Sequence, residues 1–517
     1  MTSIRSAITD ENRRWWTLGA MCFALFMIML DNTVVNVALP SIQKDLGSSI
    51  SGLEWTVNAY TLSFAVLLVT GGRLGDIFGR RRMFLFGVVV FGLSSAFIGL
   101  SQSEAWLVTG RAVQGVGAAF MMPGTLSIIS NAFPPEELGK AIGTWAGVSA
   151  IALAVGPLLG GWLTEDVSWR AIFFINLPVA IGAVIVTLFA AHESRDETVG
   201  RTVDLPGIAG ITVSLTALVF ALVEGNSWGW GSPKIIGLLA LSVVALAAFV
   251  VVEKRAVAPV VDFDALRSRQ FLGANIVAFM VSFGMLAMFF FLALYMQNIL
   301  GFSPLEAGVR FLPATVVIIF AGPIAGRLAD RFGPRPLMTA GMLITAVSLF
   351  WQSRIGVDTS YGFLAPAFVL MGLGMGLVMS PMSMAAMNAV DRTKAGVASG
   401  TLSMFRMVGG TFGVAALGAL VSSVGRHDLE RSLPAVPEGA RERLAEGLGS
   451  GGGLHDAPPR VVDAAHAAFV DALGTGLTIS AIAVAAGAVL AWLLIAPGRP
   501  SGPAPLAVAP EAELAPV

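Results

Sequence analysis

Fourteen apolar stretches follow one another along this chain of 517 residues, and they restrict its fold more than any other feature. Each stretch is close to the roughly 20 residues that a helix needs to cross a bilayer. Charged residues make up 13% of the sequence, which is about half their share in soluble proteins. Because so few charged side chains cannot cover a water-facing surface, the sequence predicts an all-α integral membrane protein with 14 transmembrane helices. The stretches lie at residues 16–38, 54–72, 83–101, 105–128, 140–163, 170–190, 205–224, 234–252, 271–297, 304–326, 337–353, 362–387, 395–421 and 468–496.

The distribution of Lys and Arg predicts the orientation. An even number of spans places both termini on the same side of the membrane. With the N-terminus inside, the inner segments hold 20 Lys and Arg residues and the short outer loops hold 5. Short cytoplasmic loops carry an excess of these residues. We therefore expect a cytoplasmic N-terminus at 1–15, a disordered cytoplasmic tail at 497–517, and an extracellular loop at 422–467 with a short helix at 437–448.

The sequence also repeats itself. "GRLGDIFG" at 72–79 matches "GRLADRFG" at 326–333 in six of eight positions, at an offset of 254 residues. Upstream, "SGLE" at 51–54 and "SPLE" at 303–306 both fit a capping box, in which Ser and Glu satisfy N–H groups at a helix start. Repeats separated by an even number of spans are parallel, as are the two halves of the major facilitator fold. The predicted organisation is 6 + 2 + 6 helices: an N-terminal bundle at 16–190, a linker with two inserted helices at 191–255, and a C-terminal bundle at 271–496.

The motif "GRLGDIFGRRR" at 72–82 follows the second predicted span. Gly72 and Gly79 permit close helix approach and a tight turn. Asp76 is able to accept hydrogen bonds from the arginines or to face the N-terminus of a neighbouring helix. The simpler interpretation is a loop that carries only the positive charges of a cytoplasmic face.

Four further stretches identify a family. They are "LDNTVVNVALP" at 30–40, "RAVQGVGAA" at 111–119, "GPLLGG" at 156–161 and "WRAIFFINLP" at 169–178. With them, the chain resembles the fourteen-helix drug:proton antiporters of the EmrB/QacA type, within the major facilitator superfamily. The resemblance covers nearly the whole of residues 15–496. It implies a multi-pass protein of the bacterial inner membrane.

The resemblance also implies roles for two groups of residues. A cytoplasmic gating loop forms and breaks as the two halves rock, and it comprises Gly72, Arg73, Asp76, Gly79, Arg80 and, from the second copy, Asp330. A helix bend shared by proton-driven exporters comprises Gly156, Pro157, Gly160 and Gly161. The proline removes a backbone donor and bends the helix, and the glycines allow tight packing of the bend. An ordinary small-residue packing helix is the alternative.

Asp31 and Arg111 are charged residues inside apolar spans, where such residues are costly. At about 1.5 Å per residue, both lie roughly 8–9 Å from the outer boundary of the membrane. We assign this pair to proton coupling: Asp31 takes a proton from outside and releases it inside, and a cationic substrate competes for the same charge. A static structural ion pair remains the alternative.

Candidate substrate-binding residues are polar, aromatic or methionine side chains within the spans. Such surfaces are able to repack around varied apolar ligands. For any one of them, plain helix packing is the alternative. They are Asn36, Asn58, Tyr60, Gln114, Met121, Asn388 and Arg406. Arg406 lies near mid-depth, where it would bind an anionic group or tune a carboxylate.

The predicted function is proton-coupled export of amphipathic drugs, antiseptics or an antibiotic by alternating access. The alternative is a proton-coupled symporter or facilitator of one metabolite. No nucleophile–His constellation, metal cluster or ATP-binding loop is present in the sequence, so we expect no enzyme, no cofactor and no ATP. The expected partners are a small amphipathic molecule, protons and the bilayer. Nucleic acid is not expected, and the chain is expected to be a monomer; the sequence does not reveal an adaptor protein.

Overall fold

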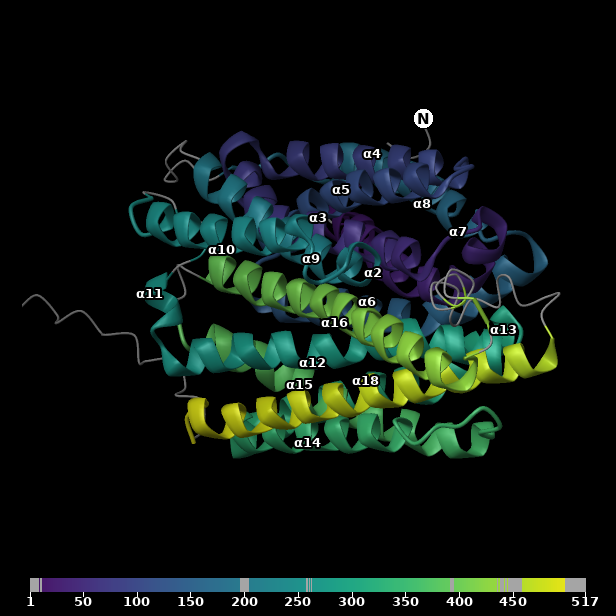
Figure 1. The fold of residues 1–517 in the computed structure, drawn as a ribbon. Coiled ribbons are helices and arrows are strands. Elements are labelled where there is room, and N and C mark those ends of the chain that lie inside the picture. Colours follow the sequence, from purple (N-terminus) through teal and green to yellow (C-terminus); the bar gives the residue numbers. More distant parts are fainter. Residues whose placement is uncertain are drawn as a thin grey trace, which may run out of the picture.

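The computed structural model is helical throughout the long segments that it describes (Figure 1). The described residues are 9, 12–195, 204–256, 259, 261, 263–390, 395–434, 436, 437, 441, 444 and 458–497. Each of the fourteen predicted apolar stretches is mainly helical; the stretch 170–190 is divided between two helices, and the stretch 271–297 ends in a π-helical turn. Within the described residues, twelve helices are long and apolar enough to cross a membrane. The two other long helices, α6 and α14, lie in the same bundle.

The N-terminal half contains the helices that form the first bundle. They are α2 (Arg13–Leu46), α3 (Ile50–Phe78), α4 (Arg80–Gly99), α5 (Glu104–Ala132), α6 (Pro135–Asp166), α7 (Ala171–Phe174) and α8 (Asn176–Ala190). A hairpin of α9 (Leu205–Trp228) and α10 (Pro233–Glu253) follows. The second half contains α11 (Phe263–Leu266), α12 (Arg269–Leu294), the π-helical turn η1 (Tyr295–Ile299), α13 (Pro304–Phe332), α14 (Pro334–Gln352), α15 (Tyr361–Met387), α16 (Ala395–Ser432) and α18 (Pro459–Leu494).

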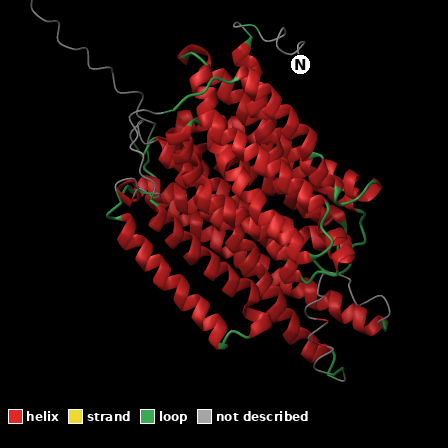
Figure 2. Cartoon of the chain, turned by 90° about the horizontal axis from the view of Figure 1, so that it is seen from above, coloured by secondary structure: helices red, strands yellow, loops and turns green. Residues whose placement is uncertain are grey.

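The long helices of the bundle run in one general direction (Figure 2). In Figure 1 the purple and blue N-terminal helices lie above the green and yellow C-terminal ones. Two helix pairs make the most extensive contacts between the halves: α3 with α16, and α6 with α13. Helix α2 also contacts α12 and α13. Helix α9 packs against both α3 and α16, while α10 packs mainly on α9. The inserted hairpin therefore covers one of the two joints between the halves.

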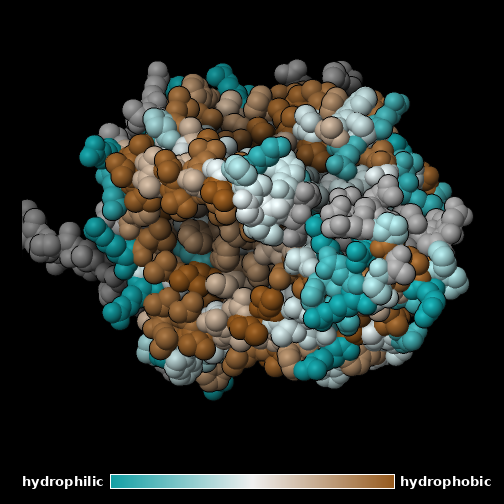
Figure 3. All heavy atoms as spheres, viewed as in Figure 1, coloured by the Kyte–Doolittle hydropathy of each residue, from teal (hydrophilic) through white to brown (hydrophobic). Residues whose placement is uncertain are grey.

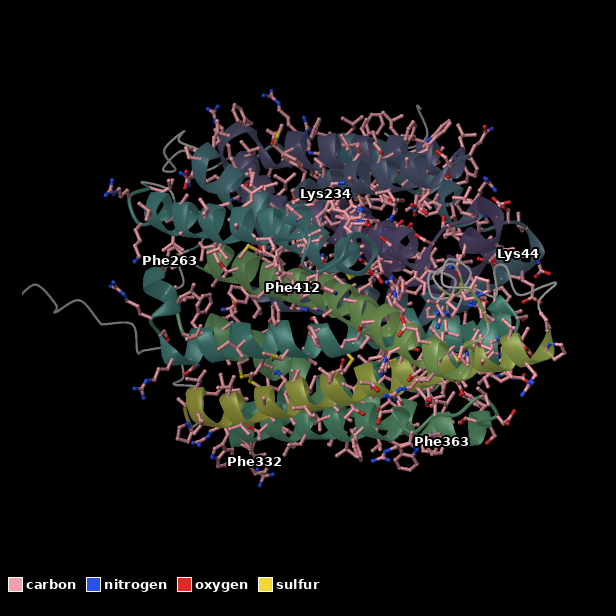
Figure 4. The ribbon with its side chains drawn as sticks, in the orientation of Figure 1. Lys44, Lys234, Phe263, Phe332, Phe363 and Phe412 are labelled. Carbon is pink, nitrogen blue, oxygen red and sulfur yellow. The ribbon has the colours of Figure 1, made fainter. Side chains whose placement is uncertain are left out.

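The bundle has two sides, which we name from the chain. The terminal side is where α2 begins and α18 ends, and the loop side is where α16 is joined to α18. In Figure 4, Phe263 and Phe332 lie on the terminal side, to the left, and Lys44 and Phe363 lie on the loop side, to the right. Between the sides, apolar atoms cover much of the face in Figure 3. Exposed side chains of α10 such as Val243 (67%) and Val244 (65%) belong to this apolar surface, which suits contact with lipid.

The helices α3 and α13 show the internal repeat most clearly. Both contain 29 residues, and both their first and their last residues are offset by 254. Ser49 and Ser303 are the two N-caps, and each accepts a hydrogen bond from a backbone N–H of the first turn. Gly79 and Gly333 end the helices with φ of 112° and 82°, which favours glycine.

The predicted capping box at Ser51 and Glu54 is wrong, whereas the one at Ser303 and Glu306 is confirmed. Helix α3 begins at Ile50 and its N-cap is Ser49, two residues before the predicted cap, so Ser51 already lies inside the helix. The error arises because three serines precede Glu54 within six residues, and only the tertiary position of the chain decides which of them caps the helix. The true counterpart of Glu54 at the repeat offset is therefore Gly308.

The predicted loop at 422–467 is much shorter in the structure. Helix α16 continues to Ser432 and α18 already begins at Pro459. An apolar stretch marks where a helix contacts lipid, and backbone hydrogen bonding continues beyond that stretch. Most of the predicted short helix at 437–448 and the whole tail from residue 498 lie outside the described residues.

Candidate functional site

A buried polar network joins α2, α4, α5 and α8. Asp31 of α2 is 0% exposed and Arg111 of α5 is 2% exposed. The Arg111 guanidinium donates to Asp31 Oδ2 over 2.5 Å and to Gln114 Oε1 over 2.6 Å. Gln114 Nε2 in turn donates to Asp31 Oδ1 over 2.9 Å. Asp31 and Arg111 thus lie at the same level of the bundle, and the two charges satisfy each other directly.

Four residues that the sequence did not single out complete this network. Ser95 of α4 accepts a hydrogen bond from Gln114, and Asn176 of α8 donates to both Ser95 and Asp31 over 3.3–3.4 Å. Arg111 Nε donates to the backbone oxygen of Thr56 in α3. The Arg111 guanidinium also lies 5.9 Å from the ring centroid of Phe173. Phe173 and Asn176 both lie in the stretch 169–178 used for the family resemblance, whereas no quoted motif includes Ser95 or Thr56.

Tyr60 lies beside the ion pair. The Arg111 guanidinium sits 4.2 Å from the centroid of the Tyr60 ring, which is a cation–π distance. Tyr60 is 0% exposed, and its hydroxyl has no hydrogen-bond partner in the described part of the chain. The side chain of Asn58, two residues earlier in α3, is also buried and lacks a partner there. Asn36 of α2 donates to the backbone of Asn32.

The structure places two of the predicted substrate-binding residues elsewhere. Met121 is fully buried in the N-terminal bundle, where Gly87 of α4 leaves room for its side chain. It packs on α4 because it lies one helical turn after Gly117, which contacts the same helix. Asn388 is exposed at the C-cap of α15 on the terminal side. Neither residue therefore lies with the buried network.

Arg406 lies in α16, eleven residues from the start of that helix. Its side chain is half-buried, and its buried Nε has no hydrogen-bond partner among the described residues. Within the same part of the structure, no ion pair involves Arg406. Such a guanidinium inside a membrane-spanning bundle is costly unless it is hydrated or meets an anion.

The first-copy gating residues lie at the end of α3 and the start of α4. Gly72, Arg73 and Asp76 belong to the last two turns of α3, so most of the predicted loop motif is helical. Arg80 Nε donates to Asp76 Oδ1 over 2.8 Å, which is the first of the two contacts expected for Asp76. Asp330 belongs to α13, but its side chain lies outside the described residues.

The glycines of "GPLLGG" lie where α6 contacts two other helices. Gly156 faces Thr33 and Gly160 faces Val34, both on α2. Gly161 faces Leu305 on α13, in the other half of the protein. At each of these glycines an added methyl group would overlap its neighbour.

Pro157 adds a second backbone contact across the halves, because its carbonyl oxygen lies against Gly308 of α13. Nearby, Leu305 N donates to Glu165 Oε2 over 3.0 Å. The motif therefore brings the two halves into backbone contact on the loop side, which single glycines make possible.

Comparisons with known proteins agree with this architecture. The sequence profile described as Major Facilitator Superfamily matches residues 21–414. The tetracenomycin C resistance and export protein of Streptomyces glaucescens is 37% identical over 495 residues, which are 93% of this chain and 91% of that protein. The puromycin resistance protein pur8 of Streptomyces alboniger is 40% identical over 414 residues, covering 79% of this chain and 82% of that protein.

A solved structure shows the same fold. It is a bacterial homologue of the human lysosomal transporter Spinster in an inward-facing, occupied conformation, with a TM-score of 0.66 and 17% identity. The match covers 93% of this chain and 97% of that structure. The helical bundle, the internal repeat, the profile match and these relatives lead to one conclusion: the chain belongs to the Major Facilitator Superfamily and is a multi-pass membrane transporter, not an enzyme.

Proposed function

We propose that this protein is a proton-coupled exporter of amphipathic drugs or antibiotics that works by alternating access. Relatives named for resistance to or export of tetracenomycin C, puromycin and cephamycin support this class of substrate. The backbone contacts of "GPLLGG" support alternating access, because they join the halves on the loop side, where such a cycle must break and re-form contacts. No ATP or other cofactor is needed in this scheme.

The single observation that carries the proposal is the buried pair of Asp31 and Arg111. An ion pair in a dry interior contributes little net stability compared with apolar side chains of similar size. The presence of this ion pair within a transport fold therefore favours a role in transport rather than in stability. Protonation of Asp31 would cancel the charge that pairs with Arg111, and a cationic group of a substrate would compete for the same carboxylate. Exclusive binding of proton or substrate is sufficient to produce exchange.

The finer assignment is to the fourteen-helix branch, with α6 and α14 as additional spans and α9 and α10 as the inserted pair. The terminal side is proposed to be cytoplasmic in a bacterial inner membrane. Arginines gather on that side at the ends of α2, α4 and α14, including Arg14, Arg81 and Arg335, in agreement with the excess of positive charge in cytoplasmic segments. A monomer is sufficient, because one chain contains both halves.

The test is transport into inverted membrane vesicles driven by an imposed proton gradient. Ethidium, puromycin and tetracenomycin C serve as substrates, and a pH-sensitive dye reports the gradient. We expect the wild type to accumulate substrate and to dissipate part of the gradient, and Asp31→Asn to do neither. Asp45→Asn is the matched control, because Asp45 also lies on α2 but its ion pair with Arg170 is partly exposed, at 45% and 30% of the two side chains.

Other outcomes contradict the proposal. Substrate movement in the same direction as the protons would favour the symporter alternative. Full coupling in Asp31→Asn would make the Asp31–Arg111 pair structural. Transport of none of the substrates would contradict the assignment as a drug exporter.

A further inference from the structure

Glu54 is a buried acid at the joint between the two halves. It lies in the second turn of α3 and is 2% exposed. Its carboxyl group lies directly against Gly418 of α16, at a point where any side chain on residue 418 would overlap it. Its Oε2 atom has no hydrogen-bond partner in the described part of the chain. The acid is therefore enclosed by the contact between α3 and α16.

The surroundings of Glu54 hold negative rather than positive charge. Glu224 of α9 approaches it, and this second carboxylate accepts hydrogen bonds from Ser51 and Trp55. Glu104 of α5 packs against Gly52, one half-turn away on α3.

The charged groups on the other helices near this end of α3 either form ion pairs elsewhere or are exposed to solvent. On α2, Asp45 pairs with Arg170 and Lys44 is exposed to solvent. From α16, the residue that faces Glu54 is a glycine. Within the described residues, no ion pair neutralises Glu54.

The internal repeat shows that the architecture does not require an acid here. At the repeat offset, the position equivalent to Glu54 is Gly308 of α13, which makes the corresponding contact across the halves with Pro157 of α6. One joint therefore closes with a glycine and the other with a carboxyl group. Glu54 therefore adds a titratable group, which helix packing at this joint does not require.

We propose that Glu54 is a proton-binding site that controls closure of the loop side: the contact between α3 and α16 closes when Glu54 is protonated and opens when it is ionised. An ionised carboxylate without a partner is unfavourable in a dry contact, particularly beside another carboxylate. When α3 and α16 separate, water reaches the group and its charged form becomes stable.

This site differs from the proton coupling assigned to Asp31. Glu54 lies four residues from the start of α3, about 6 Å from the loop-side end of that helix. It takes a proton from water on the loop side and returns it to the same side when the contact opens. Glu54 therefore responds to the pH on one side without carrying a proton across. The proposal rests on the proposed alternating-access exporter, in which loop-side acidity would drive the return of the empty transporter.

The experiment measures opening of the loop side directly, without transport. Two spin labels are placed on the full chain, at Lys44→Cys in the N-terminal half and Gly362→Cys in the C-terminal half, in a Cys22→Ser background. Both labelled positions are exposed on the loop side. Distances between the labels are recorded in lipid nanodiscs as the pH is raised from about 5 to about 9.

We expect the population of long distances to rise severalfold with pH in the wild type. Glu54→Gln, which keeps the shape of the protonated acid, should remain closed at every pH. Glu54→Ala places a small side chain here, as Gly308 does at the other joint, and it should also lose the pH response. This second variant tests whether the loss depends on glutamine itself. Glu104→Gln is the matched control and should keep a pH response, because Glu54 is still present to be protonated.

Two results would overturn the proposal: a wild-type pH response in Glu54→Gln, or a wild-type distance distribution that does not change with pH. A pH-dependent distance that Glu54→Gln abolishes, together with no drug transport by the wild type in vesicles, would support the gate and overturn only the proposed function. The two proposals can therefore fail separately.

Discussion

Asp31 of α2 accepts a 2.5 Å hydrogen bond from Arg111 of α5, although the two residues lie 80 positions apart in the sequence and inside apolar helices. Both side chains are buried. The pair therefore depends on the packing of the N-terminal bundle, and the bundle depends on the pair. This mutual dependence has a measurable consequence.

Replacing Arg111 with Met should destabilise the protein by about 3–5 kcal/mol, because it leaves the carboxylate of Asp31 buried without its partner. Adding Asp31→Asn should cost little more, since the unpaired charge is then gone. Thermal unfolding in detergent provides the measurement. Asp45→Asn, in a partly exposed pair with Arg170, should cost about 1 kcal/mol or less. Additive losses in the Asp31 and Arg111 variants would contradict this account.

Gly308→Ala should impair transport by disturbing the backbone contact with Pro157. Overpacking of this kind costs about 1–3 kcal/mol, although alanine is otherwise the better helix former by about 1 kcal/mol. Gly182→Ala in α8 is the control, because an added methyl group there meets nothing within 4 Å. Vesicle transport and thermal unfolding distinguish the two variants. Equal transport in both would show that close contact at Gly308 is unnecessary.

Asp76→Asn should lower the transport rate severalfold while the unfolding temperature changes little. Its partly exposed pair with Arg80 contributes less than about 1 kcal/mol to stability, so a loss of transport would reflect the rocking step. Arg82→Gln is a suitable control, since the Arg82 side chain is 74% exposed. Equal loss of transport in both variants would contradict a specific role for Asp76, because any change of charge in this segment would then explain the result.

Arg406→Gln should reduce transport of substrates that carry a carboxylate more than transport of ethidium. The reason is that this half-buried guanidinium has no partner among the described residues and is able to attract an anionic group. Competition between a carboxylate-bearing antibiotic and ethidium in vesicles provides the readout. Arg431→Gln, at the exposed loop-side end of α16, should leave the transport of both substrates unchanged. Parallel loss of both substrates in Arg406→Gln would indicate a structural role.

The fold was largely predictable because its main signals are local. Apolar length identifies a membrane helix, and the repeated "GRLGDIFG" and "GRLADRFG" turns identify two parallel halves. Depth along a helix follows from residue counting, so the shared depth of Asp31 and Arg111 could be predicted as well. Gly79 and Gly333 were recognisable because each follows the same motif and only glycine suits their backbone angles.

Rotation of a helix about its axis was not predictable in the same way. A span surrounded by lipid and other helices is apolar on most of its faces, so its sequence does not show which face meets which neighbour. The sequence therefore places Met121 among the substrate-binding residues, whereas its side chain packs on α4. Ser95 and Asn176 were missed for the same reason, since each is an isolated polar residue in an apolar helix.

By itself, the sequence determined that this protein is a helical membrane transporter with two related halves, and that Asp31 and Arg111 lie at one depth. The tertiary structure alone decided which helices meet at the joints between the halves. It moved the cap of α3 from Ser51 to Ser49, aligned Glu54 with Gly308, and enclosed that acid against Gly418. The physical reason is that helix formation and membrane insertion depend on local composition, whereas the environment of a buried charge depends on side chains hundreds of residues away.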